Sequence, residues 1–138
     1  ISGDLANTEP LQVGPSGWRT GRMTKIYDLS DPTKPVFVRD FGLAGQEPGS
    51  TAPGPVPPGT HGPIVLGNRV YFAYGTSTDG VLQIVDRQKL LAGPKEPTAA
   101  NLNAPEISRL YMSPNWGGHT AFPVLGMKIG DWASNTKG

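Results

Sequence analysis

The sequence predicts an all-β fold built from repeated antiparallel sheets, and two observations support this prediction. Nineteen glycines and 15 prolines among 138 residues alternate with short apolar runs, a pattern typical of strands joined by tight turns. Asp28 and Asp86 end two similar apolar runs, and the only two histidines are His61 and His119, so both pairs lie 58 residues apart. One offset shared by two independent landmarks indicates stacked or radially arranged supersecondary units.

Six short runs carry the strand signal, through alternation or through β-branched and aromatic residues. They are residues 22–28, 35–41, 63–66, 69–74, 81–86 and 106–111. Gly67 and Asn68 separate two of these runs, and both residues tolerate the positive φ of primed two-residue turns, which predicts a hairpin. Residues 88–92 predict one helical turn, which Gly93 and Pro94 end.

Composition excludes several classes of partner and chemistry. Twelve Lys and Arg against 11 Asp and Glu give a formal charge of +1, with the cations scattered, so we expect no nucleic-acid partner. No apolar run approaches the ~20 residues of a membrane span, so none is predicted. The absence of cysteine excludes disulfides, thiolate metal ligands and a cysteine nucleophile. It suits either an exported bacterial protein or a reducing compartment.

The repeat divides the chain into five parts. Residues 117–119 match residues 59–61, and residues 125–126 match residues 66–67 with one inserted residue, so another unit begins near residue 117. Residues 44–60 hold five prolines and four glycines and predict an irregular insertion. The predicted parts are a tail of a preceding unit or a loop (1–20), the outer strands of a first unit (21–43), the insertion (44–60), a complete second unit (61–116) and the start of a third (117–138).

Three segments resemble the LVIVD repeat family. They read Ile-Tyr-Asp-Leu-Ser-Asp-Pro-Thr-Lys-Pro at 26–35, Gly-Asn-Arg-Val-Tyr-Phe-Ala at 67–73 and Leu-Gln-Ile-Val-Asp at 82–86. This family is bacterial, usually exported and of the β-propeller type. The resemblance therefore implies four-stranded antiparallel blades, about two of them in this chain, forming a partial propeller. After Asp86 the sequence departs from the family's Ser-Asp-Pro turn, so a different turn is expected there.

The resemblance also carries expectations about partners and localisation. A propeller closes with at least ~4 blades, so further blades are expected from the same polypeptide or from companion chains. A periplasmic or extracellular bacterial protein is expected, with the signal peptide not present in this chain. The family carries no agreed catalytic chemistry, so whether the protein is an enzyme stays open.

His61 and His119 are the main candidates for a functional site. Each follows a glycine pair or Gly-Thr at the expected start of an innermost strand, and equivalent strands of neighbouring blades face one channel. Converging imidazoles could hold a transition metal such as Zn²⁺ or Cu²⁺, together with ligands from outside this chain. Two alternatives are acid–base catalysis and a structural role, in which each ring hydrogen-bonds the backbone of a neighbouring unit.

Other polar residues are assigned to turns or to a binding patch. Asp28, Asp31 and Asp86 follow strands, where a carboxylate accepts backbone N–H groups of the next turn. Asn115 and Trp116 stand close to His119 in the most chemically varied stretch of the chain. They are candidate binding residues with the two histidines, although packing under the glycine-rich loops is an alternative for the tryptophan.

These observations favour a propeller scaffold that binds a ligand or a protein partner on one face of the ring. In this reading the chain is part of a larger exported bacterial protein or assembly. The first alternative is a metal-dependent propeller enzyme with a histidine-lined channel. The second is a purely structural subunit or fragment.

Overall fold

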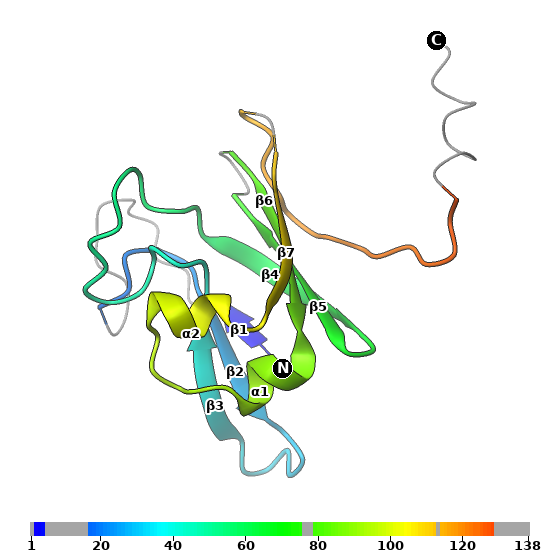
Figure 1. Ribbon diagram of the computed structural model, residues 1–138. Coiled ribbons are helices and arrows are strands. Elements are labelled where there is room, and N and C mark those ends of the chain that lie inside the picture. Colours follow the sequence, from blue (N-terminus) through cyan, green and yellow to red (C-terminus); the bar gives the residue numbers. More distant parts are fainter. Residues whose placement is uncertain (1, 5–16, 76–78, 113, 129–138) are drawn as a thin grey trace.

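A computed structural model describes residues 2–4, 17–75, 79–112 and 114–128 (Figure 1). Two antiparallel sheets and two short helices make up this part of the chain, which confirms the all-β prediction. The first sheet has the strand order β1-β2-β3 and the second has the order β4-β5-β6-β7. The strands are β1 (Ser2–Asp4), β2 (Thr24–Asp28), β3 (Val36–Phe41), β4 (Thr60–Leu66), β5 (Arg69–Tyr74), β6 (Val81–Asp86) and β7 (Glu106–Tyr111).

The second sheet is a meander in which each strand pairs with its neighbour in sequence. Leu66 pairs with Arg69, so Gly67 and Asn68 form the predicted two-residue turn between β4 and β5. Gly67 has a φ of 57°, a conformation that glycine adopts without the penalty a Cβ would bring. β6 and β7 then extend the sheet on the other side of β5.

Two helices connect β6 to β7. Helix α1 (Arg87–Ala92) covers the predicted helical turn. Helix α2 (Ala99–Asn103) was not predicted, since five residues give too short a pattern to recognise. Its start is fixed by Thr98, whose side chain accepts a hydrogen bond from the backbone N–H of Asn101, an N-cap. Each helix buries one leucine, Leu90 or Leu102.

The first sheet contains a strand that the sequence did not predict. Residues 1–20 were expected to be a tail or a loop, but Ser2–Asp4 forms β1 and pairs with Thr24–Ile26 of β2. The edge of β2 offers unpaired backbone groups that any extended segment can bond, and three polar residues carry no apolar pattern that would reveal the pairing. Residues 5–16 of that predicted part lie outside the described residues.

The two sheets pack against each other, and the core lies between them. The rings of Phe41 from the first sheet and Phe72 from the second have centroids 5.2 Å apart. Arg39 is fully buried beside them, donating hydrogen bonds to the carbonyl oxygens of Leu90 (3.3 Å) and Asn101 (3.2 Å), and burial lowers the pKa of its guanidinium. The core comprises Trp18, Met23, Ile26, Phe41, Leu43, Val70, Phe72, Tyr74, Val81, Val85, Leu90 and Leu102.

Two pairs of glycines that the sequence repeat matches have similar backbone conformations. Gly17 and Gly75 are 58 residues apart and have φ values of 83° and 82°. The matched pair Gly67 and Gly126 also share a positive φ, at 57° and 76°. Equivalent glycines therefore hold equivalent left-handed turns in successive units.

Two further predicted parts take irregular structure. Residues 44–59 of the predicted insertion are irregular, with several turns and bends, whereas Thr60 already belongs to β4. The insertion is held at its base by the buried Gln46, whose amide donates to the carbonyl oxygens of Pro57 and Pro58. Residues 117–128, assigned to the start of a third unit, run as an extended segment without strand pairing, and residues 129–138 lie outside the described residues. Neither helix of the described chain is long and apolar enough to cross a membrane.

Candidate functional site

The two histidines predicted to converge do lie against each other. His61 is the second residue of β4, and His119 follows β7 by eight residues in the extended segment. Their ring centroids are 3.5 Å apart and the ring planes are inclined by 32°. His61 is half-buried and His119 is exposed, so the pair presents one open imidazole surface to solvent.

A close backbone contact places His119. The Gly118 N–H donates to the carbonyl oxygen of Tyr74, at the end of β5, over 2.9 Å. A Cβ on Gly118 would stand 2.8 Å from that oxygen and 3.2 Å from the Tyr74 nitrogen, which leaves no space for a side chain. The equivalent residue before His61 is Thr60, which is buried and donates its hydroxyl to the Ala73 carbonyl oxygen (3.3 Å). Both histidines are thus fixed by contacts of the preceding residue with the end of β5.

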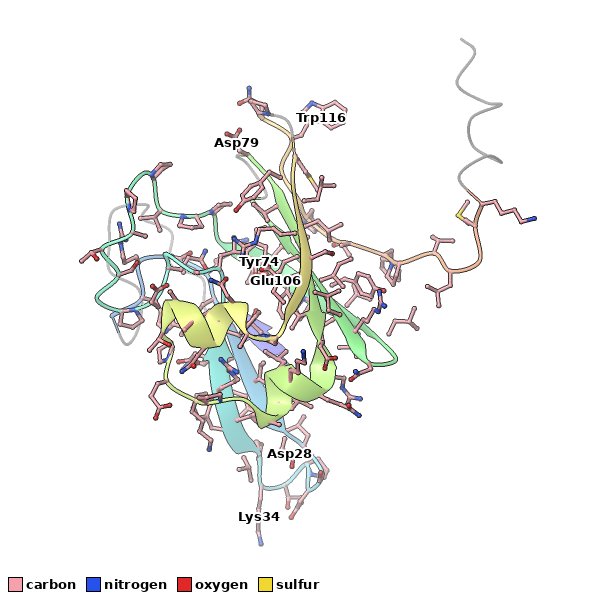
Figure 2. The ribbon with its side chains drawn as sticks, viewed as in Figure 1. Asp28, Lys34, Tyr74, Asp79, Glu106 and Trp116 are labelled. Atoms are coloured by element: carbon pink, nitrogen blue, oxygen red, sulfur yellow. The ribbon has the colours of Figure 1, made fainter. Side chains whose placement is uncertain are left out.

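The loop before Gly118 carries the other two predicted binding residues. Asn115 has a φ of 66°, and its N–H donates to a carboxylate oxygen of Asp79 at 2.7 Å. The carbonyl oxygen of Trp116 accepts from the Gly80 N–H at 2.8 Å. The Trp116 ring is 72% exposed, so packing under a loop does not describe it. Figure 2 shows Trp116 and Asp79 together at one end of the molecule.

The polar surroundings of the histidines decide how well they suit a metal. The His119 Nδ1 lies 2.9 Å from the Thr120 hydroxyl, and within the described residues neither ring bonds the backbone of a neighbouring unit. No group of three or more His, Asp or Glu side chains that could hold a metal ion occurs in the described part. A zinc site needs three or four protein ligands, so the described residues supply two at most.

Asp28 and Asp31 organise the turn between β2 and β3. One Asp28 oxygen accepts from the N–H and the hydroxyl of Ser30, at 2.8 and 2.6 Å. Asp31 accepts from the same two groups of Thr33, at 3.0 and 2.6 Å. In each case the hydrogen bond from the hydroxyl, followed by that from the N–H, lowers the pKa of the carboxyl. Asp28 lies at the end of the molecule opposite Trp116 (Figure 2), so it is not part of the histidine site.

Asp86 caps helix α1 in place of the turn seen after Asp28. Its side chain accepts from the Lys89 N–H at 2.9 Å and from the Asn68 amide at 3.2 Å. The bond from Lys89 is the largest cause of the lowered pKa of this carboxyl. Asn68 also accepts from the N–H of Gln88 (3.0 Å), so the hairpin turn and the helix start stabilise each other.

A chain of polar side chains crosses the second sheet on its buried face and was not predicted. The Tyr74 hydroxyl donates to Gln83 (2.8 Å), whose amide donates to Glu106 (2.7 Å). Glu106 pairs with Arg109, which also donates to the hydroxyl of Tyr111. Burial lowers the pKa of Arg109, but these bonds to Tyr111 and Glu106 raise it overall. The one sequence signal for these hydrogen bonds was Gln83 inside an otherwise apolar strand. The hydrogen bonds hold the side chain of Tyr74, whose carbonyl oxygen accepts from the Gly118 N–H.

A groove of about 880 Å³ lies between the first sheet and the second, and it was not predicted. β2 contributes Ile26, β4 contributes Val65, β5 contributes Phe72 and α1 contributes Leu91. The lining is mainly apolar, and its ionisable side chains are Tyr27, Asp28 and Arg87.

Comparison of the chain with known protein families, with curated proteins and with solved structures finds no match.

Proposed function

We propose that this chain is a binding module of the β-propeller type, in which successive four-stranded sheets form a scaffold and the loops at one end hold the ligand. The stacked His61 and His119 carry this proposal, because two equivalent positions of successive units meet there. A scaffold that turns about an axis brings equivalent residues together at its centre. The likeness to the LVIVD repeat family supports the same architecture and an exported bacterial protein, periplasmic or extracellular.

The binding end combines three kinds of group. Trp116 offers an exposed aromatic face, the histidine pair offers ring nitrogens, and the loop is held by backbone contacts at Gly80 and Gly118. A flat ligand with polar edges, such as a sugar ring or an aromatic acid, suits this combination, since it can stack and accept or donate hydrogen bonds.

NMR titration tests this function directly. Glucose, N-acetylglucosamine and benzoate serve as probes, and backbone amide and imidazole shifts are followed. We expect shifts at residues 115–119 and at His61, with loss of binding in Trp116→Ala. Asp31→Asn, at the opposite end of the molecule, is the matched control and should bind as the unmodified chain does. Shifts that spread evenly over the chain, or no shift with any probe at millimolar concentration, would count against a binding site at this end.

A metal-dependent function is the second candidate, and the closeness of the two imidazoles favours it. His61 and His119 would be ligands of Zn²⁺ or Cu²⁺, with the remaining ligands supplied by other blades or companion chains. Calorimetric titration with each ion distinguishes this candidate from the first. Binding of about one metal ion per chain that disappears in both His61→Gln and His119→Gln supports a metal centre. Metal binding that these substitutions leave unchanged excludes the two histidines as ligands.

A further inference from the structure

His61 lies in a β-bulge of β4 that begins opposite Tyr74. Thr60 pairs with Tyr74 and Gly62 pairs with Ala73, so His61 is the extra residue between two successive pairs. A bulge turns a side chain out of the regular alternation of a strand, and bulges are common beside functional sites. The direction of the His61 ring therefore depends on the position of Tyr74 in the neighbouring strand.

His119 depends on the same residue. The Gly118 N–H donates to the Tyr74 carbonyl oxygen at 2.9 Å, and this contact fixes the backbone directly before His119. The two imidazoles, whose ring centroids are 3.5 Å apart, are thus both placed by the backbone of Tyr74. A movement of Tyr74 would change both placements at once.

The side chain of Tyr74 is held from the other side by Gln83, Glu106 and Arg109, the rest of the polar chain. Its hydroxyl donates to the Gln83 Oε1 at 2.8 Å, and the Gln83 Nε2 donates to the Glu106 Oε2 at 2.7 Å. The same Glu106 oxygen accepts from the Arg109 Nε at 3.1 Å. Tyr74 and Gln83 are fully buried, whereas the side chains of Glu106 and Arg109 are 22% and 17% exposed. The polar chain therefore links the buried Tyr74 to the partly exposed strand β7.

Arg109 determines the direction of every hydrogen bond in the polar chain. A guanidinium group only donates and a carboxylate only accepts, so Glu106 accepts from both Arg109 and Gln83. Gln83 then has its amide oxygen left for Tyr74, and the Tyr74 hydroxyl must donate. With an apolar residue in place of Glu106, the Gln83 amide could turn over, and the Tyr74 hydroxyl could either donate or accept. The carboxylate of Glu106 therefore selects one arrangement of Tyr74.

Packing alone does not require polar side chains at this place. Val81 and Val85 flank Gln83 on the same face of β6 and are buried, and an apolar network of the same shape can be as stable as a hydrogen-bonded one. A fully bonded polar network, in contrast, restricts its members to a single arrangement. A role in placing Tyr74 accounts for a polar network where apolar side chains would suffice for packing.

We infer that Glu106 is a positioning residue of the histidine site. Its carboxylate holds Gln83 and thereby Tyr74, and the backbone of Tyr74 sets His61 and His119 face to face. Glu106 acts through these residues and not by contact with the ligand. The inference deepens the proposed function and rests on it.

Glu106→Leu and Glu106→Gln form a matched pair of variants that tests the inference. Leucine accepts no hydrogen bond, whereas the glutamine oxygen still accepts from Gln83 and Arg109. Nuclear Overhauser contacts between the two imidazole rings are measured without ligand, and affinities for glucose, N-acetylglucosamine and benzoate are measured by NMR titration. In Glu106→Leu the inter-ring contacts should disappear. The affinity for a probe that the unmodified chain binds should fall about 10-fold, the lower limit when a hydrogen-bond partner of metal-binding histidines is removed. Glu106→Gln should retain both.

Two further variants separate positioning from a general loss of stability. Leu102→Ala weakens the core at helix α2, outside the polar chain, and should keep the inter-ring contacts and the probe affinity. Gln83→Leu breaks the polar chain at its centre while the ion pair of Glu106 and Arg109 remains. It should reproduce the effects of Glu106→Leu, and it decides the question if Glu106→Leu does not fold. Circular dichroism establishes whether each variant is folded.

Unchanged inter-ring contacts in Glu106→Leu and Gln83→Leu would overturn the inference. So would equal losses in Leu102→Ala or in Glu106→Gln. The inter-ring contacts are measured without a probe, so they decide the inference even if no probe binds the unmodified chain, a result that counts against the proposed function alone. Probe binding that every variant retains would leave the proposed function standing and refute the positioning role of Glu106.

Discussion

Replacing Gly118 by alanine tests how the backbone places His119 over His61. The new Cβ would stand 2.8 Å from the Tyr74 carbonyl oxygen, so the segment must move away by several tenths of an ångström and the 2.9 Å hydrogen bond from Gly118 is lost. Losing that hydrogen bond costs about 0.5–1.5 kcal/mol of the free energy of unfolding. For a domain of this size the melting temperature should fall by about 2–7 °C.

The same substitution should separate the histidines. Nuclear Overhauser contacts between the two imidazole rings are expected in the unmodified chain and should disappear in Gly118→Ala. Gly117→Ala is the matched control, because Gly117 is the exposed neighbour, and it should keep both the contacts and the melting temperature. Unchanged inter-ring contacts in Gly118→Ala would refute the idea that this close backbone approach determines the site.

Three further changes address the fold. Tyr74→Phe removes the buried hydroxyl that bonds Gln83 and should cost about 1–2 kcal/mol in urea denaturation; no measurable loss would mean that the polar chain adds nothing to stability. Leu102→Ala should cost about 2–5 kcal/mol in thermal unfolding, since this side chain of α2 is fully buried. The half-exposed Leu91, changed to alanine as a control, should cost much less, and equal losses would contradict the packing of α2. The folded-state pKa of Asp86 lies below its ordinary 3.8, so its stabilising contribution is present above about pH 4 and is lost as pH falls through the folded pKa. Asp86→Asn should therefore lose less stability between pH 6 and about pH 3 than the unmodified chain, and an identical loss would show that the cap does not titrate.

Strong local patterns allowed most of the second sheet to be predicted. Gly67 and Asn68 between two apolar runs specified the hairpin, and alternation specified β6 and β7, because side-chain period and turn chemistry are local properties. The strand β1 and the helix α2 could not be foreseen. Each has five residues or fewer and is held by contacts with distant parts of the chain. β1 pairs with the edge of β2, and α2 is bonded to the face of the first sheet that points toward the second sheet.

The candidate site was predicted in part for the same reason. The equal spacing of His61 and His119 indicated that they occupy equivalent positions, and the structure brings them together. The polar chain from Tyr74 to Arg109 and the groove between the sheets depend on which residues face each other across strands. That information is set by register and by the β-bulge at β6–β7, which a single sequence does not display.

The strand order of the second sheet has a consequence for how the protein folds. β4 and β5 are joined by two residues and β5 and β6 by residues 75–80, so closing these loops costs little chain entropy and both pairings can form within microseconds. Adding β7 requires the 19 residues that contain α1 and α2 to be ordered, and the first sheet must be brought up across the proline-rich insertion. The β4–β6 meander is therefore expected to be the folding nucleus, with the docking of the first sheet as the slow, late step.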